Sequence, residues 1–201
     1  MAGGDAGCFR SYRDVLWDML AAAWLLLLYS IWVLGGLRVE AGGAEPLTLL
    51  RVSLEILVPG LLVVPLHEAI HAAVLRVRGY HVSFGLSMRG GIPVAYTRPL
   101  EPVRREDYVA MSLAPLAALH VVPLIGVATG LPLWAKMLFL YNTVGSAGDV
   151  LAAASALRLP SGALVRDVGD GFAECMPPPL QGVSRLIVYG AVAATVAAFL
   201  V

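Results

Sequence analysis

Three neighbouring residues have the types and the spacing of a zinc site. His67, Glu68 and His71 form the pattern H-E-x-x-H. On a helix, side chains four residues apart lie on one face, so both imidazoles can bind a single tetrahedral zinc ion. Glu68 projects about 100° away around the helix, beside the metal rather than on it. The pattern therefore predicts a Zn²⁺ site and peptide-bond hydrolysis, with Glu68 as the general base that deprotonates a zinc-bound water.

A catalytic zinc ion also needs a third protein ligand and one open position. The metzincin continuation of the motif is absent, because Val74 and Val77 stand where glycine and histidine are required. The remaining candidates in or near apolar segments are Glu55, His81, His120 and Asp149. Asp149 is the preferred third ligand, because it is the only charged residue between Lys136 and Arg158 and an unpaired charge inside a membrane is costly.

The depth of Asp149 in its apolar segment supports this choice. With a cytoplasmic N-terminus, the second and fourth apolar segments run in the same direction. At ~1.5 Å per residue, His67 and His71 lie about 10–16 Å from the inner end of one segment, and Asp149 lies about 13 Å from the inner end of the other. The three side chains are therefore predicted to meet at one level.

Three polar residues are predicted to assist the site. Asn142, Ser146 and Asp149 share one face of the fourth segment, so Asn142 and Ser146 are candidates to orient the aspartate or to bind the substrate backbone. The alternative for Asn142 is a hydrogen bond that only joins two helices. His120 lies in the middle of the third segment, where it either contributes to the site or donates a hydrogen bond to a nearby carbonyl.

The composition is that of a membrane protein. Of 201 residues, 59% are hydrophobic and 14% are charged, which leaves too few charges to cover the surface of a soluble domain. The 14 basic and 14 acidic residues form no concentrated basic face, so nucleic acid is not expected as a partner. The expected partners are the lipid bilayer and a membrane-associated protein or peptide substrate, and the sequence does not indicate an oligomeric state.

Apolar segments long enough to be helices follow one another along the whole chain. We predict an all-α polytopic membrane protein with about five transmembrane helices in a single domain, residues 1–201. A cytoplasmic N-terminus leaves only Arg38, Arg51 and Lys136 outside, among 14 basic residues, as the positive-inside tendency requires. The predicted spans are about 15–37, 52–77, 108–129, 133–157 and 183–201.

Two segments between the spans are predicted to lie at the cytoplasmic face. Apolar and polar residues alternate on both sides of Gly90 and Gly91, so residues 80–97 are predicted to form a β-hairpin, with Pro93 marking an edge strand. The hairpin either captures an extended substrate by β-augmentation or packs as a flap on the bilayer or the helices. Residues 159–180 are predicted to form a cytoplasmic loop with a short strand near residues 163–168.

Three sequence stretches together resemble a known family. H-E-A-I-H at residues 67–71, N-T-V-G-S-A-G-D-V at 142–150 and L-P-S-G-A-L-V-R-D at 159–167 are similar to the prokaryotic putative zincin peptidases. The layout is similar to that of site-2 proteases, which implies His67, His71 and Asp149 as ligands, Glu68 as the base and a place in a prokaryotic cell membrane. The site-2 N-P-D-G pattern is replaced here by G-S-A-G-D, so that wider similarity is partial.

The expected function is a membrane-embedded zinc metalloprotease that acts on membrane-associated proteins. The alternative is a non-proteolytic scaffold or chaperone that keeps the metal and binds partner proteins. A metal carrier is disfavoured, because transport requires several acidic or histidine sites along a path.

Overall fold

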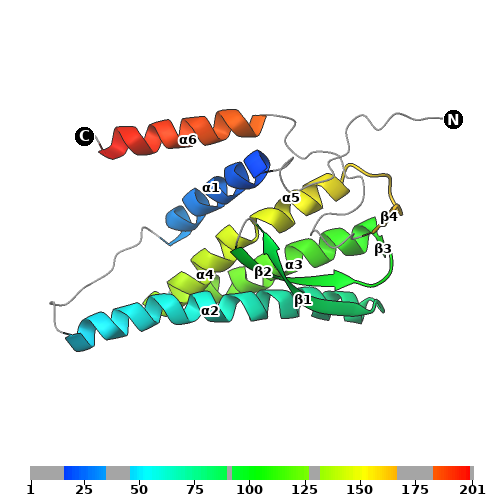
Figure 1. Ribbon diagram of the computed structural model, residues 1–201, viewed down its shortest axis with the longest axis horizontal. Helices are drawn as coiled ribbons and strands as arrows, with labels where there is room; N and C mark the ends of the chain where they lie inside the picture. Colours follow the sequence, from blue (N-terminus) through cyan, green and yellow to red (C-terminus); the bar gives the residue numbers. More distant parts are fainter. Residues whose placement is uncertain (1–15, 35–45, 90–91, 127–131, 167–182, 200–201) are drawn as a thin grey trace.

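A computed structural model of the chain describes residues 16–34, 46–89, 92–126, 132–166 and 183–199. This part of the chain is mostly helical, with two small antiparallel sheets, which confirms the predicted helical fold with an inserted hairpin. The helices are α1 (Leu16–Val33), α2 (Pro46–Val77), α3 (Arg105–Gly126), α4 (Leu133–Gly145), α5 (Ala147–Ala156) and α6 (Val183–Phe199), and the strands are β1 (Val82–Arg89), β2 (Ile92–Pro99), β3 (Val103–Arg104) and β4 (Leu164–Val165). In Figure 1, α2 and α3 lie beside each other, and α4 and α5 follow in line above them. Helix α1 packs on α4 and α5 on the side away from α2, and α6 packs on α1.

Two of the described helices, α1 and α2, are long and apolar enough to cross a bilayer. Helix α2 has 32 residues and begins six residues before the predicted span, at Pro46 rather than at residue 52. Its apolar side chains are largely exposed, Leu57 at 62% and Leu61 at 76%, whereas the core helix of a soluble protein would bury them. The prediction of about five transmembrane helices is not tested beyond these two.

The fourth predicted span, residues 133–157, is two helices rather than one. Helices α4 and α5 meet at Ser146, where the backbone leaves the helical conformation (φ −72°, ψ 5°). Gly145 and Gly148 on either side have low helix propensity, and the Ser146 hydroxyl donates to the Asn142 carbonyl at 2.8 Å, a contact that bends helices. The Ser146 hydroxyl thus bonds within the helix at this break, and its role at the site stays a prediction.

The hairpin forms two residues later than predicted, with Val82 opposite Pro99 at its open end. It packs against α2 at the H-E-x-x-H motif, where the Thr97 hydroxyl donates to the Glu68 carbonyl at 3.0 Å. Strand β2 pairs only with β1 among the described strands, so its other edge has no strand partner there. This arrangement places an edge strand beside the motif helix.

A second sheet, which the sequence pattern did not indicate, joins the loop after α5 to the start of α3. Strand β4 pairs with β3, and the predicted strand near residues 163–168 is therefore confirmed at Leu164–Val165, while residues 167–180 lie outside the described part. The Glu106 carboxylate, at the start of α3, accepts hydrogen bonds from the Ser161 hydroxyl at 2.9 Å and the Gly162 N–H at 3.1 Å. Hydrogen bonds from its own backbone N–H, from the Gly162 N–H and from the Ser161 hydroxyl lower the pKa of Glu106 to about 2.

The best-buried apolar cluster ties the ends of α2, α3 and α5 together. Its members come from these helices and from both strands of the second sheet: Leu75, Val103, Tyr108, Met111, Ala152, Ala156 and Val165. Because this core lies within one or two helical turns of the motif, it fixes the relative positions of the three helices near the site.

Candidate metal centre

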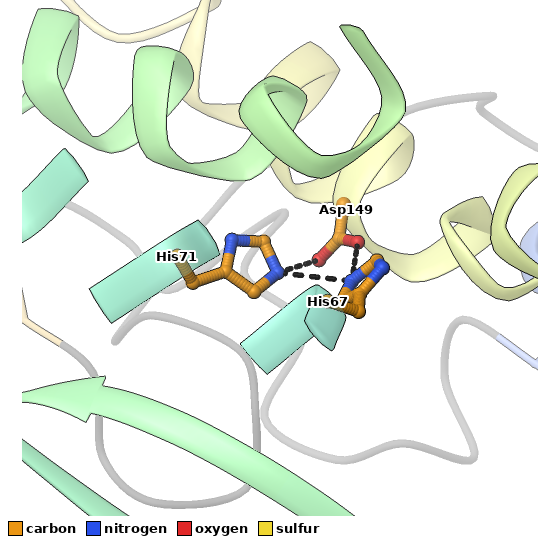
Figure 2. A group of neighbouring side chains, drawn as sticks. All are labelled: His67, His71 and Asp149. Atoms are coloured by element: carbon orange, nitrogen blue, oxygen red, sulfur yellow. Dashed lines mark hydrogen bonds and ion pairs between the residues drawn. The ribbon is translucent and has the colours of Figure 1, made fainter. Parts of the chain in front are cut away.

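His67, His71 and Asp149 converge at one point between α2 and α5. Their potential ligand atoms all lie within 4.8 Å of one another. His67 Nε2 lies 2.9 Å from Asp149 Oδ2 and 3.0 Å from His71 Nε2, which is 3.4 Å from Asp149 Oδ1. Figure 2 shows the two imidazoles and the carboxylate pointing toward one another. The structure thus brings together the two histidines of the motif and the aspartate that was preferred as their partner.

Local structure explains how these side chains meet. The i, i+4 spacing in α2 stacks His67 and His71 on one face. Asp149 lies in the first turn of α5, which exists as a helix end only because the chain breaks at Ser146. The unpaired N–H groups of a helix N-terminus stabilise a negative charge, so the break gives the half-buried Asp149 carboxylate a favourable environment.

The outer nitrogens of both imidazoles are held by oxygen acceptors. His71 Nδ1 lies 2.9 Å from the Met111 carbonyl oxygen, which can only accept, so Nδ1 carries the proton and donates. His67 Nδ1 lies 2.9 Å from Asn142 Oδ1, and Asn142 Nδ2 donates to the Pro115 carbonyl at 3.1 Å. That second bond fixes the amide orientation, because a flipped amide would set two oxygens against each other. His67 Nδ1 therefore also donates.

With both Nδ1 atoms protonated, the point where His67, His71 and Asp149 meet contains more hydrogen-bond acceptors than donors. In neutral imidazoles protonated at Nδ1, the Nε2 lone pairs are bare, and both are directed at each other and at the Asp149 carboxylate. Such groups at 2.9–3.4 Å repel each other unless a cation lies between them. Two imidazoles and one carboxylate are a donor set of catalytic zinc, whose tetrahedral ligands lie roughly 3.3–3.4 Å apart at ~2.0–2.1 Å from the metal. The residues present fit zinc.

Two of the alternative ligands lie elsewhere and have other partners. Glu55 accepts a hydrogen bond from Arg51 Nε at 2.8 Å, one turn earlier in α2. His81 has a side chain that is 82% exposed and lies 3.3 Å from Glu101 Oε1. Neither residue belongs to the metal-capable group found among the described residues.

His120 is also apart from this group. Its ring stacks on Tyr29 at a centroid distance of 5.5 Å and meets the edge of Phe139 at 4.7 Å. Its Nδ1 donates to the Leu116 carbonyl of the same helix at 2.7 Å. The structure therefore gives His120 the hydrogen bond to a carbonyl that was its alternative interpretation, at the junction of α1, α3 and α4.

A cleft of about 240 Å³ opens beside His67. Glu68 and His67 line it from α2, Val94 and Ala95 from β2, and Gly145 from α4, together with Val63, Val64, Tyr141 and Asn142. A molecule in this cleft would lie between the motif glutamate and the edge strand. The cleft has room for a few side chains or a short extended peptide rather than for a large cofactor.

Helix α3 takes part in the site, although its sequence indicates no such role beyond His120. Its contributions are the carbonyls of Met111 and Pro115, which hold His71 directly and His67 through Asn142. The role of a backbone carbonyl cannot be predicted from residue type, because every residue has one. The one available signal was a proline within an apolar helix, which frees a carbonyl one turn earlier.

Comparison with known proteins agrees with the geometry. The sequence model of a family described as "Putative zincin peptidase" matches residues 60–164. An uncharacterized 24.7 kDa protein of Pyrococcus woesei, from the gap 5′ region, is 33% identical over 140 residues, which are 66% of this chain and 61% of the relative. This chain thus spans less than two thirds of that relative's length, and no solved structure matches significantly. The family match covers more than half of the chain and contains His67, His71 and Asp149, so this protein belongs to the putative zincin peptidase family, whose metal is zinc.

Proposed function

We propose that this protein is a membrane-embedded zinc metalloprotease that hydrolyses peptide bonds of membrane-associated proteins. The observation that carries the proposal is the convergence of the ligand atoms of His67, His71 and Asp149 within 4.8 Å of one another, beside a cleft that Glu68 lines. In this proposal His67, His71 and Asp149 hold the metal, and Glu68 acts on the water and the substrate.

The chain's own residues supply the proton transfers. Zinc, when bound, lowers the pKa of a bound water toward ~7 and polarises the carbonyl of the bond to be cleaved. The Glu68 carboxylate takes one proton from the attacking water as its oxygen bonds to the carbonyl carbon. Glu68 then returns that proton to the leaving nitrogen as the C–N bond breaks. Its place in the cleft beside His67 is the place this role requires.

The surface of α2 supports a location in the membrane. Most of the exposed large apolar side chains of α2 lie between Leu47 and Leu66, before the motif, whereas His71, Ala72 and Leu75 within and after the motif are buried. At ~1.5 Å per residue the motif lies about 15 Å from the end of α2 at Val77, next to Arg78. We therefore propose a multi-pass protein of the prokaryotic cell membrane with a cytoplasmic N-terminus and the zinc site nearer the cytoplasmic side.

The hairpin supports capture of an extended substrate. Val94 and Ala95 of β2 line the cleft opposite Glu68, and the outer edge of β2 has no strand partner in the described part of the chain. A peptide that added to this edge would pass the motif in an extended conformation, as proteolysis requires.

Glu68→Gln tests the proposal, with Glu55→Gln on the same helix as the matched control. The purified Glu68→Gln protein should retain zinc, lose at least ~10²-fold in turnover and retain bound proteins that the wild type cleaves. Asp149→Ala should lose zinc. Bound proteins that the wild type never cleaves would contradict proteolysis and favour a scaffold, and equal zinc in wild type and Asp149→Ala would remove Asp149 from the site.

A further inference from the structure

Two carbonyls of α3, one helical turn apart, hold the candidate ligands, one directly and one through Asn142. The Met111 carbonyl accepts the Nδ1–H of His71 at 2.9 Å. The Pro115 carbonyl accepts from Asn142 Nδ2 at 3.1 Å, and Asn142 in turn accepts the Nδ1–H of His67. A helix that provides no ligand therefore orients both imidazoles.

The residue type at position 115 explains why the first carbonyl is available. In a regular α-helix the carbonyl of residue 111 accepts the N–H of residue 115. Pro115 has no N–H, and its ring pushes against that carbonyl, so the Met111 oxygen is left without its intrahelical donor. Met111 and Pro115 are buried, and a buried carbonyl needs a partner. The His71 Nδ1–H is that partner.

We propose that Pro115 is a positioning residue for the zinc site. By lacking an N–H, it reserves the Met111 carbonyl for His71 and holds the imidazole in the tautomer whose Nε2 binds the metal. Its own carbonyl anchors Asn142 and so the ring of His67. The inference rests on the zinc site described above and is independent of whether the protein cleaves peptides.

Helix α3 offers a matched control in Pro123, eight residues further on. Pro123 frees the carbonyl of Leu119 in the same way, and neither histidine of the motif donates to that carbonyl. Pro115→Ala and Pro123→Ala thus make the same chemical change in one helix, and only the first restores an N–H that competes with His71.

The test is zinc affinity in detergent, measured by competition with a chelator. Pro115→Ala should bind zinc about 10–100-fold more weakly than wild type, and Pro123→Ala should stay within about twofold. The visible spectrum of the cobalt-substituted protein should change in Pro115→Ala alone. Wild-type affinity in Pro115→Ala, or an equal loss in both variants, would overturn the proposal.

Thermal unfolding without metal separates positioning from a structural role. Alanine favours the interior of a helix more than proline does, so metal-free Pro115→Ala should be at least as stable as wild type. A metal-free variant that is less stable, and binds zinc weakly for that reason, would contradict the proposal. Should Pro115→Ala not fold, Pro115→Ser restores the same N–H and carries the same expectation. A wild type without zinc affinity would refute the zinc assignment itself.

Discussion

Replacing Asn142 with leucine should weaken zinc binding without touching a ligand. Asn142 is 1% exposed and bridges His67 Nδ1 and the Pro115 carbonyl. Leucine is of similar size but leaves the His67 Nδ1–H without its acceptor, at about 1–3 kcal/mol in the free energy of unfolding. Because His67 then lacks the hydrogen bond that orients its ring, zinc affinity should fall about 10–100-fold.

The affinity loss can be read as a change in zinc-dependent stability. At a zinc concentration 100 times the wild-type Kd, zinc stabilises the wild type by ~2.7 kcal/mol. If Kd rises 10–100-fold at the same concentration, this stabilisation falls to about 1.4–0.4 kcal/mol. The measurement is the difference in Tm between metal-free and zinc-loaded protein in detergent.

Thr143→Val is the matched control, because it removes a buried hydroxyl from the neighbouring residue. The Thr143 hydroxyl donates only within its own helix, to the Phe139 carbonyl at 2.8 Å. This variant should keep the full zinc-dependent shift in Tm. A full shift in Asn142→Leu as well would refute the reasoning that Asn142 orients His67, and an equally reduced shift in both variants would point to general damage in α4.

Two further predictions concern the cleft and the loop at α3. A Cβ on Gly145 would meet nothing within 4 Å, so Gly145→Ala should leave zinc binding and turnover near wild type. Gly145→Leu should instead fill the cleft and reduce turnover at least ~10-fold with zinc affinity unchanged. Equal turnover in both variants would show that substrate does not use the cleft. The pKa of Glu106 is lowered from 4.5 to about 2, so its contribution to stability is complete above pH 4.5 and is lost as the pH falls toward 2. The difference in Tm between wild type and Glu106→Gln should therefore shrink between pH 5 and pH 2, and a difference that stays constant would contradict the assignment.

The central part of the site could be predicted because its determinants are local. The spacing of His67 and His71 sets their shared face through helical periodicity alone. Asp149 could be chosen because a single charge in a long apolar segment is costly without a partner. The number of residues between Asp149 and the predicted cytoplasmic end of its segment then placed it at the same depth as the two histidines, because all α-helices have the same rise per residue.

Other features escaped prediction because they depend on weak or non-local interactions. The break at Ser146 arises from glycine propensities of about 1 kcal/mol, which the surrounding packing could have overridden in a continuous span. Strand β3 has two residues, and nothing in its sequence indicates that it pairs with β4, about sixty residues away. His120 would carry the same sequence signal as a ligand or as a donor to a carbonyl, and only the positions of Tyr29 and Phe139 distinguish the two.

The extent of the family match indicates which part of the fold makes the zinc site. The match begins at residue 60 within α2 and ends at residue 164, the first residue of β4. Strand β4 is far from the zinc ligands in sequence, but it pairs with β3 at the start of α3, and its Val165 belongs to the cluster that joins α2, α3 and α5. Helix α3 in turn holds both imidazoles through its carbonyls, so the position of its first turn bears on the ligand geometry. A unit from the motif helix to β4 is therefore the smallest part of this chain that contains the ligands together with everything found to orient them, and α1 and α6 lie outside it.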